Sequence, residues 1–123
     1  MSSEIQVYAG LSCKNGNFTF PRVGDLPAFV NQSAVGGAVP GFQVIGTSAE
    51  TVSTTDLATP GWCYAKNLDS TNYVELGPDS SGFVPFIKLK PGEQTVFRLA
   101  SGVTFKAKAN TAAVKLQIYV FED

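Results

Sequence analysis

The sequence predicts an all-β protein, an antiparallel β-sandwich of the jelly-roll type with about eight or nine strands. Apolar and polar residues alternate over short segments, which suits a strand with one buried face and gives no helical stripe. Turn residues recur between these segments every 8–12 residues or so. No connection is long or helical enough to join parallel strands, so the sheets are expected to be antiparallel.

The first twenty residues predict a hairpin. Apolar residues alternate along the first strand at Ile5, Val7, Ala9 and Leu11. Asn15-Gly16 supplies residues that tolerate positive φ in a two-residue loop. Phe18 and Phe20 begin the return strand, and Pro21 ends it or places it at a sheet edge.

Residues 24–40 are the least regular part of the chain, with two prolines and the pair Gly36-Gly37. They predict a loop with a short strand near residues 28–32. Further strands are expected around residues 42–47 and 51–55, before a turn at Thr59-Pro60-Gly61. A helix over residues 48–57 is the alternative, but the threonines and the valine in this segment disfavour it.

The second half gives the most regular pattern. Strands are expected at residues 62–68, 73–76, 83–89, 95–99, 103–108 and 114–121. Residues 69–72 predict a turn, and residues 90–93 a type II turn with proline and glycine at its central positions. Pro85 cannot donate to a ladder and is expected at an edge or a bulge.

Size and composition fit one domain over residues 1–123, with residues 1–40 as a less regular hairpin and loop that forms a docking segment. Charged residues make up 15% of the chain, against about 25% in typical domains. The net charge of -1 gives no long-range attraction for phosphates, so nucleic acid is not expected as a partner. A secretory signal and a membrane span are not expected either.

The sequence offers little chemistry. It contains no histidine, no phosphate-binding glycine loop and no paired-cysteine zinc spacing. No catalytic residue, cofactor or metal is therefore predicted, and the chain is not expected to be an enzyme. Asp69, Asn72, Glu75 and Asp79 gather hard oxygen ligands, but they lack a calcium-loop spacing. Cys13 and Cys63 are expected to be buried thiols, with a disulfide as the alternative.

Trp62 and Tyr64 are the aromatic residues with two open interpretations. They share one face of the strand at residues 62–68, and Cys63 and Ala65 share the other. The favoured interpretation places both rings in the core, because aromatic side chains dominate burial. The other places them outward, where they suit a sugar ring or a partner protein.

A resemblance covers roughly residues 41–123. It rests on four stretches: GFQVIGTSAETV, GWCYAKNLDSTNYVELG, FVPFIKLKPGEQTVFRLA and FKAKANTAAVKLQIYVFED. Its most specific motifs are Asn67-Leu68-Asp69 with Thr71-Asn72-Tyr73, residues 89–93, and residues 107–111. In these stretches the chain resembles small all-β virion structural proteins of tailed bacteriophages. The motifs are turns and sheet positions, so they indicate a scaffold.

The resemblance implies a non-enzymatic capsid decoration (cement) protein that stabilises the phage head through protein–protein contacts. A tail, neck or head-fibre component of the virion is one alternative, and a glycan-binding β-sandwich module is another. The implied partners are the major capsid protein or other virion proteins, and a homotrimer is implied by analogy. The implied location is the virion, assembled in the host cytoplasm.

The contact residues expected from the sequence lie in two segments. Apolar side chains of the loop before residue 40 form a docking patch or close one end of the sandwich. The candidate partner-contact residues are Leu26, Phe29, Val30, Val35, Val39, Trp62 and Tyr64.

Overall fold

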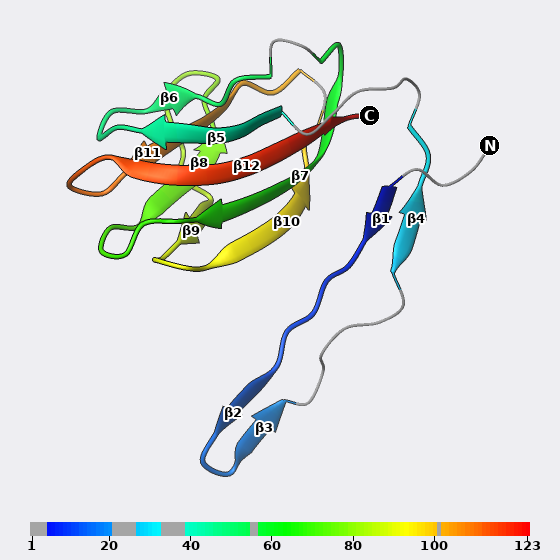
Figure 1. Cartoon of the computed structure of the whole chain (residues 1–123), viewed down its shortest axis with the longest axis vertical. Coiled ribbons are helices and arrows are strands. Elements are labelled where there is room, and N and C mark those ends of the chain that lie inside the picture. Colours follow the sequence, from blue (N-terminus) through cyan, green and yellow to red (C-terminus); the bar gives the residue numbers. More distant parts are fainter. Residues whose placement is uncertain (1–4, 21–26, 33–38, 55–56, 101) are drawn as a thin grey trace. The chain divides into compact units, whose positions relative to one another are not determined.

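The computed structural model of the chain describes residues 5–20, 27–32, 39–54, 57–100 and 102–123. These residues form twelve strands and no helix, and every strand pair is antiparallel (Figure 1). The all-β class is therefore confirmed. The chain divides into two compact units, Met1–Ser33 and Ala34–Asp123.

The N-terminal unit contains four short strands: β1 (Ile5–Val7), β2 (Cys13–Asn15), β3 (Phe18–Phe20) and β4 (Ala28–Val30). β1 pairs with β4, and β2 pairs with β3. Asn15 lies opposite Phe18, so the hairpin loop is Gly16-Asn17, with Gly16 at a φ of 59°. A hairpin at this position is confirmed, and its loop begins one residue later than expected. Its first strand is Cys13–Asn15, however, and of the alternating segment expected there only Ile5–Val7 forms a strand, which pairs with β4.

The described part of the N-terminal unit has no core of its own. All of its described residues are exposed or half-buried, and each strand has a single partner. Large apolar side chains are accessible to solvent along it: Tyr8, Leu11, Phe18, Phe20 and Phe29. An isolated two-stranded hairpin is marginally stable in water, so this unit gains little stability from its own contacts.

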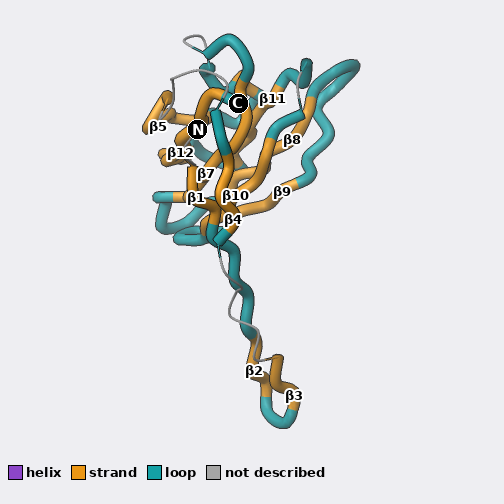
Figure 2. Tube along the Cα trace, turned by 90° about the vertical axis from the view of Figure 1, so that its right-hand side faces the viewer, coloured by secondary structure: helices purple, strands orange, loops and turns teal. Residues whose placement is uncertain are grey.

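The C-terminal unit contains eight strands in two four-stranded sheets. The first sheet has the order β10-β7-β12-β5 and the second the order β6-β11-β8-β9. Their bounds are β5 (Val39–Ile45), β6 (Glu50–Thr51), β7 (Pro60–Asn67), β8 (Val74–Pro78), β9 (Ile87–Leu89), β10 (Gln94–Arg98), β11 (Phe105–Ala109) and β12 (Val114–Glu122). In Figure 2, β12, β7 and β10 lie to the left of β11, β8 and β9.

The strand pairs of the C-terminal unit are nested in the sequence. β5 pairs with β12, β6 with β11, β7 with β10, and β8 with β9. Two further pairings, β12 with β7 and β11 with β8, join these pairs into the two sheets. Each strand of the first half of the unit thus meets its counterpart from the second half.

The two sheets share one hydrophobic core. β12 is the longest strand, and its alternation buries Val114, Leu116, Ile118 and Val120 completely. From the second sheet come Val74, Leu76, Phe105 and Ala107, and the Phe105 ring lies 5.3 Å from the Phe97 ring of β10. Burial of each Leu, Ile or Val side chain contributes about 1.5–3 kcal/mol. The alternation expected for the strands at residues 103–108 and 114–121 is confirmed by the burial of these positions in β11 and β12.

Several predicted elements differ from the structure. The expected total of eight or nine strands is wrong, because the N-terminal unit adds four short strands to the eight of the C-terminal unit. The expected turn at residues 59–61 is wrong as well, since Pro60 and Gly61 begin β7. Pro60 pairs with Glu122 where the ladder changes register, a position that tolerates a missing N–H donor. The helix considered for residues 48–57 is absent from the part of that segment that the structure describes, and Glu50–Thr51 forms β6 there.

The strand expected at residues 83–89 is shorter in the structure. Only Ile87–Leu89 forms β9, and Phe83 makes an isolated bridge to Asp79. Between them the backbone leaves the ladder and passes close to Gly77, with Val84 N–H donating to Pro78 O and Phe86 N–H to Leu76 O. Pro85 lies in this irregular segment, as its missing donor predicts.

Candidate functional site

The side chains of β7 alternate strictly between the core and the outer face of the first sheet. Cys63, Ala65 and Asn67 are buried, whereas Trp62 and Tyr64 are half-buried on the outer face. The favoured prediction that both rings lie in the core is wrong, and the outward alternative is correct. The core opposite β7 is filled by larger side chains of the neighbouring elements, so β7 contributes small ones.

The outer face of the first sheet carries a cluster of apolar and aromatic side chains, here called the aromatic face. It consists of Phe42, Val44, Trp62, Tyr64, Val96 and Tyr119. Tyr64 lies opposite Tyr119 on β12 and opposite Val96 on β10. Phe42 and Val44 are 53% and 63% exposed, a large fraction for apolar side chains on a sheet.

Hydrogen bonds and ring contacts fix the two tyrosines of the aromatic face. Their rings are nearly parallel, with centroids 6.1 Å apart and 27° between the planes. The Tyr64 hydroxyl donates to Oε1 of Gln94 at 2.7 Å, and Nε2 of Gln117 donates to the Tyr119 hydroxyl at 2.9 Å. A neighbouring amide thus holds each ring, and the cluster is organised before any ligand arrives.

Cations surround the aromatic face. The Arg98 guanidinium lies 5.8 Å from the Trp62 ring centroid, and Lys115 Nζ lies 4.9 Å from that of Phe42. Lys66 extends the face along β7, opposite Gln117 and Gln94. Among the described residues of this face, the single carboxylate is Asp123, which forms an ion pair with Arg98. The face is therefore positively charged, although the whole chain carries a net charge of -1.

The outer face of the second sheet is charged and nearly balanced. Glu75 on β8 lies between Lys108 on β11 and Lys88 on β9. Lys106 Nζ lies 2.9 Å from Oδ2 of Asp79, and this hydrogen bond lowers the pKa of the Asp79 carboxyl. The two outer faces therefore differ in chemistry. The outer face of the first sheet is the more apolar, and it suits a partner that packs against aromatic rings.

The motifs that carry the phage resemblance meet at one end of the C-terminal unit, around Asn67. The buried Asn67 amide donates to Asn72 O and Leu89 O, both at 2.9 Å, and accepts from Asp69 N–H at 2.8 Å. Its backbone pairs with the turn at residues 90–93. Thr111 from the third motif donates to the Asn72 side chain at 2.8 Å. All three motifs thus contribute residues to one hydrogen-bonded cluster of loops, and their role there is structural.

The carboxylates considered for calcium are engaged with protein groups. Asp69 accepts from the backbone N–H groups of Asn72 and Thr71, and these bonds lower the pKa of its carboxyl. Asp79 is bound to Lys106. In the described ranges, no group of three or more Asp, Glu, Cys or His side chains is placed to hold a metal ion.

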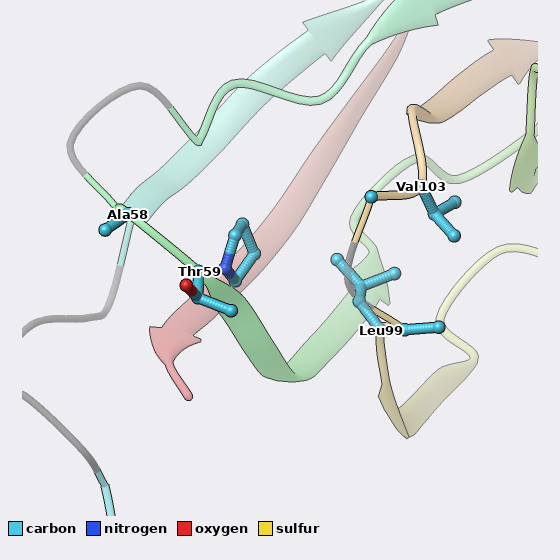
Figure 3. A pocket seen from close by; sticks show the side chains of 7 residues that line it. Ala58, Thr59, Leu99 and Val103 are labelled. Carbon is cyan, nitrogen blue, oxygen red and sulfur yellow. The ribbon is translucent and has the colours of Figure 1, made fainter.

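A small pocket of about 120 Å³ opens between the start of β7 and the connection after β10 (Figure 3). Ala58 and Thr59 lie on one side, and Leu99 and Val103 on the other. On the Thr59 side, the buried carboxylate of Glu122 accepts the backbone N–H groups of Ala58 and Thr59 at 3.0 and 2.7 Å. Among the described residues that line the pocket, the Thr59 hydroxyl is the single polar side-chain group.

The predicted docking residues fall into both units. Leu26 and Val35 lie outside the described residues. Phe29 is exposed and Val30 half-buried in β4, whereas Val39 begins β5 and packs against the core of the C-terminal unit. Sequence reasoning missed Phe42, Val44, Val96 and Tyr119 as site residues. The sequence pattern that could have identified them is the alternation along each strand, in which each of these residues lies next to a position that faces the core.

Both cysteines are free thiols in different environments. Cys13 is exposed on β2, which corrects the expectation that it is buried. Cys63 is buried, as expected, and burial raises the pKa of its thiol to about 12. Its Sγ–H donates to Gly61 O at 3.4 Å.

This difference predicts that one thiol reacts in the native protein. Because the thiolate is the reactive form, we expect a disulfide reagent to modify Cys13 rapidly and Cys63 only after denaturation. Absorbance with Ellman's reagent, with and without denaturant, measures both classes. The Cys13→Ser variant is the control and has no fast phase. Rapid labelling of two thiols in the native protein contradicts the burial of Cys63.

Comparison with known proteins gives no assignment, since no protein-family model, curated protein or solved structure matches the chain. In the ranges that the structure covers, no helix has the length and hydrophobicity to cross a membrane.

Proposed function

We propose that the chain is a non-enzymatic structural protein of a bacteriophage virion, which decorates the capsid and stabilises the head through protein–protein contacts. The observation that carries this proposal is the N-terminal unit. Its described strands form two-stranded ladders without a buried residue and expose Leu11, Phe18 and Phe29. A segment of this kind becomes stable when a partner covers its apolar side chains.

We infer that the C-terminal unit is a jelly-roll β-sandwich. A jelly roll can be derived from a long antiparallel hairpin of eight strands that is rolled up. In such a hairpin the first strand pairs with the last, the second with the second-to-last, and so on to the two middle strands, which pair with each other. The pairs β5–β12, β6–β11, β7–β10 and β8–β9 follow this rule. Rolling accounts for the added pairs β12–β7 and β11–β8. Such a unit is a rigid body on which an attachment segment can be carried.

The proposal of a binding role agrees with the chemistry of the chain. Histidine, the usual acid–base residue at neutral pH, does not occur in the sequence. The Cys63 thiol is buried with a raised pKa, which makes it a poor nucleophile. The hydrogen-bonded loop cluster around Asn67 stabilises the unit and presents no reactive group.

The resemblance to phage virion proteins provides the biological setting of the proposal. In that setting the partner of the N-terminal unit is the major capsid protein or another virion protein, and the assembled form is a homotrimer. The protein is then located in the virion after assembly in the host cytoplasm. A position in the tail, neck or head fibre is the alternative within the same class.

The test starts from purified particles of the phage that encodes the chain. Mass spectrometry should detect the chain in the particles, and a cryo-electron microscopy map should show density for its two sheets on the outside of the capsid. Density on the tail, neck or a fibre would favour the alternative position. Particles that lack the chain altogether would disprove the virion assignment.

A binding assay tests the role of the N-terminal unit. Full-length protein is added to particles that lack it, and bound protein is measured after sedimentation. We expect the Phe18→Ser/Phe20→Ser variant to bind at least about tenfold more weakly, because it removes the exposed aromatic side chains of β3. Lys108→Gln on the second sheet is the matched control and should bind normally. Equal binding by both variants would contradict this role.

A further inference from the structure

The aromatic face is a preformed platform with partly accessible rings. Trp62 and Tyr64 are two residues apart on one strand face, a separation of about 7 Å. Tyr119 lies beside Tyr64 on the next strand, with the ring centroids 6.1 Å apart. The rings therefore extend in two directions over the sheet. The hydrogen bonds of Gln94 and Gln117 to the tyrosine hydroxyls hold this arrangement.

Such a platform is complementary to a sugar ring. The C–H groups of a pyranose carry partial positive charge and pack well on the electron-rich face of an aromatic ring. Gln94 and Gln117 still have amide groups that are not used by the tyrosines, because each amide has several donor and acceptor positions. Amides beside aromatic rings can then bond to the hydroxyl groups of the sugar.

The charge of the face selects among glycans. Lys66, Arg98 and Lys115 border the rings, and the one carboxylate of the face, Asp123, is paired with Arg98. In the described part of the chain, Lys66 and Lys115 therefore share this face with one carboxylate, which is paired with Arg98, so the field favours an anionic ligand. A sugar that carries a carboxylate combines a ring for stacking with a charge for the lysines.

The same observations disfavour two other occupants. A second copy of the chain in a two-fold contact would bring Lys66 and Lys115 against the same cations of its partner. A single-stranded nucleic acid needs an extended basic track, whereas the chain has a net charge of -1 and the arginine of the face is already paired.

We propose that the aromatic face of the first sheet binds an acidic polysaccharide, with Trp62, Tyr64 and Tyr119 stacking on its sugar rings and Lys66 and Lys115 binding its carboxylates. This activity is independent of the proposed virion role. The particle-binding test uses variants of β3, whereas the glycan test uses variants of β7 and β12. Failure of one proposal is therefore distinguishable from failure of the other.

The test uses the single tryptophan of the chain, Trp62, as the reporter. Its emission is recorded while full-length protein is titrated with oligogalacturonate, alginate oligosaccharides or polysialic acid. We expect a saturable change in emission with at least one of these acidic glycans, and weaker binding as the salt concentration rises. The methyl ester of a bound uronic-acid oligosaccharide, which keeps the sugar rings and masks the carboxylates, should bind at least about tenfold more weakly.

Variants of residues on the aromatic face test whether the glycan binds there. Tyr119→Ala and Lys66→Gln should each weaken binding about tenfold or more, with circular dichroism and the melting temperature confirming the fold. Lys108→Gln is the matched control, because it removes a lysine from the outer face of the other sheet, and it should bind like the parent protein.

Four results of the binding experiments would overturn the proposal. They are the absence of binding to all three acidic glycans, equal binding of the esterified and free acids, an equal loss in the Lys108→Gln control, and tighter binding of single-stranded oligo(dT) than of any glycan. Sedimentation equilibrium tests whether a second copy of the chain binds to this face. Self-association that is abolished by Tyr119→Ala would assign the face to a second copy and also overturn the proposal.

Discussion

Replacement of Gly77 by alanine is expected to destabilise the C-terminal unit by about 3 kcal/mol, at the upper end of the usual range for overpacking. A Cβ at this position would lie 2.0 Å from the carbonyl oxygen of Val84 and 3.0 Å from its carbonyl carbon. Both are backbone atoms, so rotation of a side chain cannot relieve the clash. Hydrogen bonds from Val84 N–H to Pro78 O and from Phe86 N–H to Leu76 O hold the segment in place.

Urea denaturation of the Gly77→Ala variant, followed by circular dichroism, measures this effect as a lower midpoint. Gly77 is not among the glycines with positive φ, so the expected loss arises from steric overlap and not from backbone conformation. Ser81→Ala in the nearby exposed loop is the control and should change stability by less than about 0.5 kcal/mol. A normal midpoint for Gly77→Ala would show that residues 84–86 do not pass over β8 as described.

Replacement of Asn67 by alanine is expected to cost about 3 kcal/mol of unfolding free energy. The variant leaves the carbonyl groups of Leu89 and Asn72 and the N–H of Asp69 without their partner. An unsatisfied buried polar group costs about 1–3 kcal/mol, and those near the surface recover part of this by binding water. Because Leu89 belongs to the second sheet and Asn67 to the first, the loss also weakens the connection between the sheets.

Calorimetric or denaturant unfolding of Asn67→Ala measures the loss, and Asn110→Ala in an exposed turn is the matched control. A second variant, Asn67→Asp, keeps the size of the side chain and removes the two donated hydrogen bonds. It should be at least as unstable as the alanine variant, because it also buries a charge at neutral pH. An Asn67→Asp protein as stable as the parent would contradict the assigned donor role.

The alternating pattern predicted much of the C-terminal unit. The inward residues of β12, the core positions Phe105 and Ala107, and the turn at residues 90–93 lie where the sequence places them. The antiparallel arrangement was predicted because the connections are too short for parallel strands. These features depend on local spacing and on turn chemistry, both of which are visible in the sequence.

The candidate site was predicted only in part. Trp62 and Tyr64 were singled out, but the favoured placement in the core was wrong, because alternation defines two faces without telling which is inward. That choice depended on β12 and β10, which lie on either side of β7. Phe42 and Tyr119 join the site through cross-strand register between segments far apart in the sequence.

By itself, the sequence determined the all-β class, the antiparallel pairing and the main buried face of the last strand, because side-chain period and turn residues are local properties. Tertiary structure alone decided which face of β7 is outward, that the two outer faces differ in charge, and that Gly77 must lack a side chain. These features arise where distant strands meet, and the packing of each strand depends on partners that its own residues do not specify.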